Sequence, residues 1–514
     1  MLGMSDYLIA PRDRKFVEAV MRMTVCNPFI PERNQLERLA LGDDYTETPR
    51  PWNIYPDEVL RDPNIKALKV RSEDVAKRCR ENLLRCKTIP EQEIPAYAAV
   101  VNFNAYYYFR KVFDDHIADA HATGRAHIKR AFYREYEEYV QHYFCVNGEM
   151  LKIQYTPTHM FAFGYQLRRA YYHIFGYVIG TSDVARRLRA RIWQSIFTHD
   201  LQRYLRALHT RMGDIITLIT GPSGSGKELV AQAIALSRYI PFDERERQFA
   251  DNFLDTFYPI NLTALSPTLI ESELFGHRKG AFTGALQDRP GYLETCGNCG
   301  TVFLDEVGDV DPVIQVKMLR VLQTRSFQRL GDTQTLPFEG KIMAATNKDL
   351  VEEIEQGRFR EDFYYRLCAD QVQTPALKDI LAEKQHELSF LVHYIAGKVA
   401  GESEADALTD EVCAWVTERL GLDYAWPGNF RELEQCVRNI LIHREYHPHR
   451  VQKQRTVSGL IDEGTLSADQ LMRQYVTRVY AELRDYKQTA ARLDLDPRTV
   501  KKYVDDRLLL NLDA

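Results

Sequence analysis

The residues with the clearest chemical potential lie in a glycine-rich turn, GPSGSGKE, at positions 221–228. Its glycines allow the backbone to point successive N–H groups at a phosphate chain, and Lys227 can reach the terminal phosphates of a nucleotide. An apolar run that contains Ile216 and Leu218 precedes the turn. The helix-like stretch ELVAQAIAL follows, so the positive end of a helix would face the same phosphates. The predicted nucleotide-binding residues are Gly221, Pro222, Ser223, Gly224, Ser225, Gly226, Lys227 and Glu228.

Two carboxylates at the end of a second apolar run, TVFLDE at 301–306, are the expected catalytic partners of this turn. Ligands of parallel α/β sheets lie at the carboxyl ends of the strands, so Asp305 and Glu306 should face the phosphates. We expect Asp305 to hold Mg²⁺, directly or through water, and Glu306 to polarise the attacking water. The predicted cofactors are therefore ATP and Mg²⁺. Glu228 stands where most such turns carry a Ser or Thr for the metal ion.

A third motif, GAFTGA at 280–285, has no evident role in nucleotide chemistry. It is a loop bracketed by glycines, with Phe282 and Thr283 at an apolar tip. An apolar tip is costly to leave in water, so we expect this loop to meet a protein partner.

The elements that would position these motifs fall into five segments. Residues 1–178 are helix-like and rich in aromatic side chains, and are predicted to form a mainly helical N-terminal domain. In 179–375, short apolar strands alternate with helical stretches, the pattern of a parallel α/β sheet. Residues 376–447 read as helices only, 448–462 as a polar linker, and 463–514 as a short helical module. The predicted fold class is multidomain α/β.

The composition excludes several classes of protein. Hydrophobic residues make up 45% and charged residues 27%, which is typical of a globular chain. No apolar run is long enough for a membrane span and the N-terminus lacks a signal peptide, so we expect a cytoplasmic protein with no membrane partner. The net charge of -5 means that any nucleic-acid contact needs a local basic surface.

The nine cysteines are scattered along the chain, and an odd number cannot all pair. This distribution fits reduced thiols rather than a disulfide framework. Cys296 and Cys299 have CxxC spacing, but two ligands do not complete a zinc site and no further ligand lies nearby in sequence. The spacing favours a turn, and a metal or redox role stays open.

The stretch ESELFGHRKGAFTGA at 271–285 resembles the bacterial enhancer-binding proteins, the sigma-54-dependent transcriptional activators of the AAA+ ATPase class. The resemblance covers about 179–447 and the C-terminal module, and nothing before them. It implies an AAA+ P-loop ATPase core with a helical lid. It also implies that the loop contacts sigma-54 and transmits the ATPase cycle to it. The implied contact residues are Gly280, Ala281, Phe282, Thr283, Gly284 and Ala285.

Further motifs of this family match in order along the chain. Asn261 matches the asparagine that restrains the catalytic glutamate, so the resemblance implies a switch between Asn261 and Glu306. AATNKDL resembles the strand whose end senses the γ-phosphate in this family, which implies that role for Asn347. Arg360 and Arg366, in GRFREDFYYRL, match the arginines lent to a neighbouring subunit, and guanidinium presents fixed charge to developing phosphate charge.

Arg431, in WPGNFREL, matches the lid arginine that reports the nucleotide state, and a Glu after the cradle lysine is common in the family. Two departures stand out: the turn Cys-Gly-Asn-Cys, and TPALKDILAEK where the family usually has a proline pair and basic residues. We expect altered lid packing rather than lost catalysis.

The sequence pattern of the C-terminal module is typical of a helix-turn-helix. Asp496 is a candidate cap and Pro497 suits the first turn of the second helix, which would read DNA. Over 463–514, nine Lys or Arg balance nine Asp or Glu, so the charge signal is weak. The family commonly ends in a Fis-like DNA-binding module, which favours DNA over a plain helical hairpin. The expected DNA-binding residues are Arg498, Thr499, Lys501 and Lys502.

Residues 1–178 are expected to sense a signal and to control the motor, and the signal itself cannot be read from the sequence. A chain starting near Tyr177 should then hydrolyse ATP without a signal. Six polar residues are candidate metal ligands, although an amphipathic helical surface more often looks like this. These are Asp115, His116, Asp119, His121, Glu138 and His142.

Together these features predict an ATP-hydrolysing activator that binds double-stranded DNA at upstream, enhancer-like sites and remodels sigma-54 RNA polymerase holoenzyme into open promoter complexes. Borrowed arginines require neighbouring copies, so we expect a homo-oligomer, a hexameric ring. Two alternatives stay open: a AAA+ DNA-binding regulator that does not act through sigma-54, and another AAA+ remodelling motor.

Overall fold

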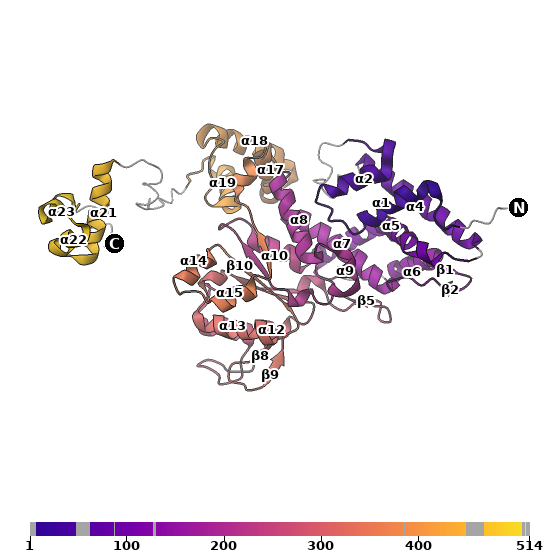
Figure 1. Cartoon of the computed structure of the whole chain (residues 1–514), viewed down its shortest axis with the longest axis horizontal. Helices are drawn as coiled ribbons and strands as arrows, with labels where there is room; N and C mark the ends of the chain where they lie inside the picture. Colours follow the sequence, from indigo (N-terminus) through magenta and orange to yellow (C-terminus); the bar gives the residue numbers. More distant parts are fainter. Residues whose placement is uncertain are drawn as a thin grey trace. The chain divides into compact units, whose positions relative to one another are not determined.

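The computed structural model describes residues 7–47, 62–86, 88–126, 130–384, 386–448, 467–505 and 509. The chain forms two compact units, Met1–Arg444 and Glu445–Ala514, which are described separately (Figure 1). The predicted linker at 448–462 lies, apart from its first residue, outside the described residues. In the part of the chain that the structure describes, no helix is long and apolar enough to cross a membrane.

A five-stranded parallel sheet forms the centre of the larger unit, with the strand order β11-β3-β10-β7-β6. The predicted parallel α/β core is therefore confirmed. The register brings the last residues of neighbouring strands to one edge, where Thr346 pairs with Thr220 and Asn261 with Asp305. The strands are β3 (Thr217–Thr220), β6 (Phe257–Asn261), β7 (Thr301–Asp305), β10 (Lys341–Thr346) and β11 (Asp370–Gln373).

Alternate side chains of the buried strands enter two different cores. Met343 and Ala345 of β10 point into the core shared with α8 (Asp183–Phe197) and α10 (Lys227–Ala235). Ile342 and Ala344 enter the core shared with helices on the other face. This alternation follows from the two-residue period of a strand, and it explains why these runs are apolar throughout.

The second face of the sheet is covered by α11 (Pro267–Phe275), α12 (Tyr292–Thr295) and α13 (Pro312–Thr324). A two-stranded hairpin follows α13. The remaining elements of this part are β8 (Ser326–Gln328), β9 (Thr335–Pro337), α14 (Leu350–Glu355) and α15 (Glu361–Leu367).

Four helices follow the sheet, as the sequence predicted for the lid. Helix α17 packs against α18 and α19, and α16 packs against α17 and α19. Their bounds are α16 (Leu377–Leu381), α17 (Glu387–Ala400), α18 (Glu402–Arg419) and α19 (Asn429–His443).

The described N-terminal residues are mostly helical and share an aromatic core. The long α5 contributes Tyr97, Phe109 and Phe113 to this core, which also holds Tyr133 and Phe161. The helices are α1 (Arg14–Met23), α2 (Glu32–Leu41), α4 (Pro63–Arg85), α5 (Ile94–Thr123), α6 (Arg130–Phe144) and α7 (Pro157–Tyr177). A short hairpin of β1 (Cys145–Val146) and β2 (Glu149–Met150) separates α6 from α7.

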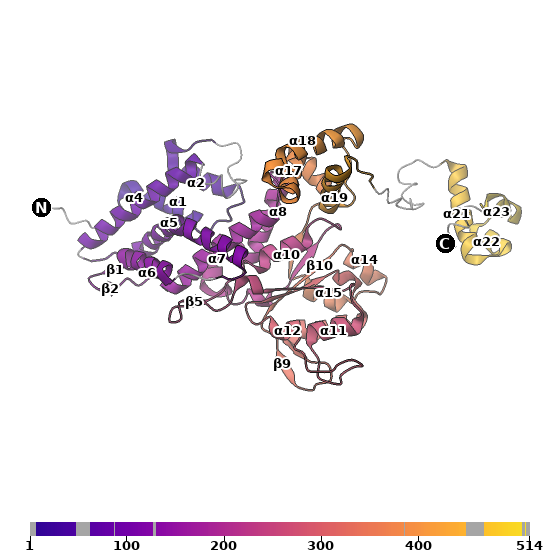
Figure 2. The same ribbon diagram turned by 180° about the vertical axis from the view of Figure 1, so that it is seen from behind.

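The N-terminal helices do not stand apart from the α/β core. In both views α7 lies between them and α10 (Figures 1 and 2). Phe163, Ala170 and Ile174 of α7 are buried in the same core as the sheet residues Ile219 and Phe303. Residues on both sides of the predicted boundary at 178 therefore contribute to one hydrophobic core.

Within residues 467–505, the smaller unit forms α21 (Ala468–Leu483), α22 (Tyr486–Leu493) and α23 (Pro497–Tyr503). Val476, Ala490 and Val500 form its buried centre, one from each helix. The Asp496 side chain accepts a hydrogen bond from Arg498 N, and Pro497 occupies the first turn of α23. This cap and this proline are in the predicted positions.

Candidate nucleotide site and partner loop

The glycine-rich turn joins β3 to α10 and is closely surrounded by two other segments. A Cβ on Gly221 would lie 2.1 Å from Thr374 Oγ1, and one on Gly224 would lie 2.3 Å from the Gly428 carbonyl oxygen. Both glycines also have positive φ angles, of 146° and 73°. Only glycine meets these conditions without displacing a neighbour, which explains the residue type at both positions.

Lys227 is the first residue of α10, and it is buried although it carries an amine. Its Nζ donates hydrogen bonds to the carbonyl oxygens of Gly221 at 3.1 Å and Pro222 at 3.2 Å. Burial lowers the pKa of Lys227, while the negative charges of Glu306 and Asp305 oppose this shift. The amine is thus held inside the turn, where the predicted phosphates would lie.

Two other side chains of the turn, Ser225 and Glu228, differ in role: the first stabilises the turn and the second is exposed. Ser225 Oγ donates to Pro222 O at 2.7 Å and lies 2.6 Å from Thr374 Oγ1, so it fixes the turn against the end of β11. Glu228 is exposed on the first turn of α10 and accepts a hydrogen bond from Gln232 Nε2 at 3.5 Å.

The two predicted carboxylates lie at the carboxyl end of β7, across from the turn. Asp305 is its last residue, and Glu306, the next residue, has a positive φ of 56° and interacts electrostatically with Lys227. Burial raises the pKa of Glu306, and the nearby Asp305 adds to this, whereas Lys227 opposes it. Glu306 Oε2 is buried and has no hydrogen-bond partner.

An unpartnered carboxylate oxygen in a buried position costs free energy. Such an oxygen fits a site built to hold a water molecule beside a nucleotide. The turn, the buried amine of Lys227 and the pair Asp305 and Glu306 are together a donor and acceptor set suited to a nucleoside triphosphate and Mg²⁺.

Asn261 is the last residue of β6 and Asn347 directly follows β10, and these two strands lie on either side of β7. The Asn261 Oδ1 atom accepts hydrogen bonds from Thr263 N and Thr263 Oγ1, both at 2.8 Å. The predicted switch with Glu306 therefore stays a prediction. Asn347 is exposed just beyond β10, and its backbone N–H lowers the pKa of Glu306 against the larger effect of burial.

The start of α19 reaches the turn from the lid. Arg431 Nη1 lies 3.5 Å from Ser223 Oγ, and Phe430 N donates to Gly224 O at 3.1 Å. Asn429 is buried at this contact: its Nδ2 donates to Ser223 O at 2.9 Å and its Oδ1 accepts from Leu377 N at 2.8 Å.

The sequence prediction included Arg431 but missed Asn429. One amide joins the phosphate turn, the segment before α16 and the first turn of α19. Its place two residues before Arg431, in a stretch that matched the family, was the available signal.

The two predicted trans-acting arginines lie on the surface of this copy. Arg360 precedes α15 and forms a bidentate pair with Asp362, at 3.0 and 2.7 Å, with 47% of each side chain exposed. Arg366 is exposed near the end of the same short helix. A role in a neighbouring subunit stays a prediction for both.

The GAFTGA loop folds back on itself between its two glycines. Gly280 N donates to Ala285 O at 2.9 Å, and Ala285 N donates to Phe282 O at 3.0 Å. Thr283 is exposed at the tip, whereas the Phe282 ring lies 5.0 Å from the His277 ring. Leu286, directly after the loop, is 83% exposed. Of the predicted tip, Thr283 is exposed and Phe282 is half-buried, and the exposed apolar side chain is that of Leu286. Contact with a protein partner stays a prediction.

The base of this loop is braced by the hairpin of β8 and β9. Arg278 forms ion pairs with Asp288 at 2.6 Å and Asp332 at 2.7 Å, and its backbone N donates to Leu330 O. Arg278 thus connects the two arms of the loop to the tip of the hairpin. A movement of the loop would therefore displace the hairpin tip.

In the smaller unit, the expected DNA-contacting residues share α23. Arg498, Lys501 and Lys502 are exposed and Thr499 is half-buried. The ammonium of Lys502 lies 5.3 Å from the centre of the Tyr503 ring.

The remaining candidates are the two cysteines and the six polar residues, of which Asp115, Asp119, Glu138 and His142 are exposed. Cys296 and Cys299 are free and buried, and burial raises the pKa of the Cys296 thiol to about 11. Among the described residues, no group of three or more potential metal ligands occurs. His121 lies 3.1 Å from His173, between their Nε2 atoms, and Glu138 pairs with Arg134.

Comparison with known proteins bears directly on the α/β part of the chain. Residues 196–373 match the family model described as "Sigma-54 interaction domain". The "Nif-specific regulatory protein" of Azotobacter vinelandii is 42% identical over 231 residues, which cover 44% of this chain and 40% of that protein. The "Transcriptional regulatory protein ZraR" of Klebsiella oxytoca is 40% identical over 242 residues, covering 46% of this chain and 49% of that protein.

The match thus spans less than half the length of these curated relatives. Among solved structures, NtrX from Brucella abortus in complex with ATP aligns with 22% identity and a TM-score of 0.39, over 68% of this chain and 76% of that one. The chain is therefore similar to a sigma-54 interaction domain over residues 196–373, and to these two regulatory proteins over less than half of its length.

Proposed function

We propose that this chain hydrolyses ATP to remodel sigma-54 RNA polymerase and so activates transcription from DNA that it binds itself. The observation that carries the proposal is the pairing, in one sigma-54 interaction domain, of an exposed GAFTGA loop with a complete phosphate cradle. A partner-binding loop and a nucleotide site in one rigid domain are what a motor needs to convert hydrolysis into movement.

In this proposal the residues around the turn have separate tasks. The backbone of 221–226 and the Lys227 amine bind the phosphates, and Asp305 holds Mg²⁺. Glu306 accepts the proton of the attacking water, and its raised pKa makes it a better base than an ordinary carboxylate. Arg431 and Asn429 link the lid to the turn, so the lid position depends on what the turn binds.

The active form is proposed to be a ring of identical copies. Arg366 on α15 and Arg360 just before it are exposed, and each is proposed to enter the site of a neighbouring copy, Arg360 after release from Asp362. There, fixed positive charge stabilises the transferring phosphoryl group. A hexamer is the assembly that the family resemblance implies. Binding of double-stranded DNA is assigned to α23, whose basic side chains are exposed.

The deciding experiment is formation of open promoter complexes by purified sigma-54 polymerase, followed by permanganate reactivity of unpaired thymines. The full chain with ATP should open the promoter, and the full chain with a non-hydrolysable analogue should not. ATP hydrolysis without promoter opening, at any concentration of the chain, would favour the alternatives of a regulator independent of sigma-54 or another remodelling motor.

A further inference from the structure

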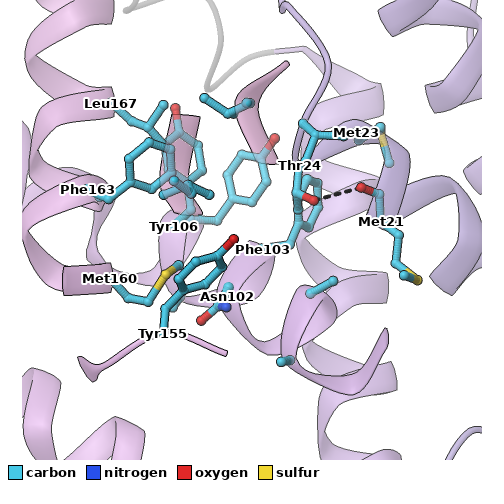
Figure 3. Close-up of a pocket in the computed structure, with 18 of the residues that line it drawn as sticks. Met21, Met23, Thr24, Asn102, Phe103, Tyr106, Tyr155, Met160, Phe163 and Leu167 are labelled. Atoms are coloured by element: carbon cyan, nitrogen blue, oxygen red, sulfur yellow. Dashed lines mark hydrogen bonds between the residues drawn. The ribbon is translucent and has the colours of Figure 1, made fainter. Parts of the chain in front are cut away.

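The N-terminal helices enclose a cavity of about 740 Å³ that no nucleotide residue lines. Its walls come from α1, α5, α7 and the segment before α7. Figure 3 shows Met21 and Met23 on one side, Phe103 and Asn102 from α5, and Met160 and Phe163 from α7. A volume of this size is typical of pockets for small organic molecules.

The lining is mainly apolar and aromatic, with a few polar groups left unused. Asn102, Tyr107 and Tyr155 line the cavity, and none of their side chains makes a hydrogen bond to another described residue. Burial raises the pKa of Tyr107 to about 12, so its hydroxyl is neutral and can donate or accept. Unused hydrogen-bonding groups in an apolar wall favour a ligand that carries a matching polar group.

The buried or half-buried charges at the wall are paired, with Arg110 sharing Asp114 at 3.5 Å, whereas the lining residues Lys152 and Arg206 are exposed. Arg33 Nε donates to Glu37 at 2.6 Å, and Arg168 forms a bidentate pair with Asp114 at 2.7 and 2.9 Å. A charged ligand would have to compete with these pairs after losing its own hydration. The chemistry therefore favours a neutral molecule.

Helix α7 lines this cavity and also packs against α10, and the cavity borders the core around the sheet through Phe163, Trp193 and Leu205. Met160, Phe163 and Leu167 face the cavity. Gln166 and Arg169, which lie on another face of the helix, bind the end of α10. With 3.6 residues per turn, Arg169 lies on the opposite side of the helix from Met160, because nine residues make two and a half turns.

The contact between α7 and α10 is specific and fully buried. Arg169 donates from Nη1 to Leu236 O at 3.0 Å and from Nη2 to Arg238 O at 2.7 Å. Gln166 Nε2 donates to Ser237 O at 2.9 Å. A guanidinium at the carboxyl end of α10 satisfies carbonyls that the helix leaves unpaired. The other end of α10 begins with Lys227.

We propose that this cavity is the effector site of the protein: it binds a neutral, mainly apolar small molecule with one or two hydrogen-bonding groups, and its occupancy changes how α7 holds α10. The proposed ligand site is argued from the cavity alone. Only the statement that its occupancy controls a transcription motor rests on the proposed function.

Binding is tested on the full chain with N-phenyl-1-naphthylamine, a neutral and mainly apolar fluorophore with one N–H donor. Saturable binding of one molecule per chain is expected. Met160→Trp and Ala98→Phe, which fill the cavity from two helices, should each remove it. Met150→Trp adds the same indole ring at an exposed position outside the cavity and should bind as the original chain does.

Absence of saturable binding by the original chain, or unchanged binding by either folded cavity variant, overturns the site. Because a filled cavity can also destabilise the fold, circular dichroism is recorded for each variant, and the two variants act as independent tests.

The polar part of the ligand class is tested by displacement of the fluorophore. We expect 1-naphthol to displace it at about tenfold lower concentration than naphthalene does, the change that one ordinary hydrogen bond gives. Asn102→Leu should reduce this preference while naphthalene still competes. If both compounds displaced the fluorophore from the original chain at equal concentrations, the polar groups of the cavity would not contribute to ligand binding.

Coupling to the motor is measured as the Kd of ADP, by calorimetry, with and without saturating fluorophore. We expect a shift of about fivefold or more, and ADP should change the fluorophore's Kd by the same factor, because coupling between two sites is reciprocal. Arg169→Lys should still bind the fluorophore but lose most of the shift, since one ammonium cannot hold both carbonyls. An unchanged shift in this variant overturns transmission through α7. These readouts need no polymerase, so they stand even if promoter opening fails.

Discussion

The guanidinium of Arg169 is fully buried and donates a hydrogen bond to the carbonyl oxygen of Leu236, the residue that follows α10. An N-terminal residue thus satisfies the carboxyl end of the helix whose first residue is the phosphate-binding lysine. Burial lowers the pKa of Arg169 to about 10, which leaves it charged at neutral pH. This contact is a structural requirement of the nucleotide-binding core, and the first prediction concerns its removal.

Arg169→Ala should lower the free energy of unfolding by about 3 kcal/mol, because two buried carbonyl oxygens lose their donor and a cavity replaces the side chain. Urea denaturation followed by circular dichroism measures the change. Arg134→Ala removes an arginine whose side chain is 73% exposed and should change stability little. Equal effects of the two substitutions would contradict a structural role for Arg169.

The same contact alters an expectation drawn from the sequence. A chain that starts near Tyr177 was expected to hydrolyse ATP without a signal. Such a chain lacks Arg169, and it exposes the apolar residues of α8 and α10 that pack on Ile174. We now expect that truncation to aggregate, so regulation by the N-terminal helices is better tested with the cavity variants of the full chain.

The second prediction concerns pH and Glu306. A carboxyl whose pKa is raised in the fold stabilises the fold only below its ordinary pKa, and this contribution is lost as the pH rises through the raised value. The ionised Glu306 side chain therefore lowers the stability of the fold at neutral pH. Glu306→Gln should have a higher Tm than the original chain at pH 8, and the difference should shrink as the pH is lowered toward 5.

The same variant should still bind ATP but lose hydrolysis by about 10²-fold or more, because the general base is gone. Asp309→Asn, an exposed carboxyl of the same segment, is the control for the loss of one negative charge. A Glu306 variant with normal turnover, or a Tm difference that grows as the pH falls, would contradict the assignment.

The third prediction separates the loop from the nucleotide site. Thr283→Ala should leave ATP hydrolysis by the free protein nearly unchanged, because Thr283 is exposed at the loop tip and not at the sheet edge that holds Asp305. It should abolish promoter opening with sigma-54 polymerase. Thr417→Ala, at an exposed threonine of α18 that bonds only within its helix, should open promoters normally. Normal opening by the Thr283 variant would show that the tip does not act on the polymerase.

The fourth prediction tests whether sites are shared between copies. Arg366→Ala should lower turnover by about 10³-fold while ATP still binds. Mixing it with Lys227→Ala protein should restore part of the activity, since an intact Lys227 and an intact Arg366 can then meet at mixed interfaces. Arg187→Ala, at an exposed arginine of α8, is the matched control. If mixed rings form and no ratio restores turnover, Arg366 does not act across an interface.

Local features of this fold could be read from the sequence because their causes are local. The apolar run before Gly221 and the helix after Gly226 follow from side-chain periodicity, and the cap of α23 follows from Asp496 and Pro497 standing side by side. The same holds for the two carboxylates that end β7.

Contacts between distant segments could not be read in this way. Asn429 Nδ2 bonds Ser223 O across 206 positions of sequence, and Arg169 reaches Leu236 O across 67. The cavity is likewise a product of α1, α5 and α7 packing around an unfilled space. In each case the residue type is ordinary for a helix, and its role is set by which surfaces meet during folding.

The fifth prediction concerns DNA binding by the smaller unit. Arg498→Ala combined with Lys501→Ala removes two exposed charges from α23 and should weaken binding of the full chain to DNA that it selects from a random pool. The slope of log K against log salt should fall by about one for each lost phosphate contact. ATP hydrolysis without DNA should be unaffected.

Arg478→Ala combined with Arg492→Ala removes the same charge from α21 and α22, where both side chains are exposed, and should keep both affinity and slope. If the control pair weakens binding as much as the α23 pair does, the effect is one of net charge. Unchanged binding by the α23 pair would instead place DNA recognition on another surface of the chain.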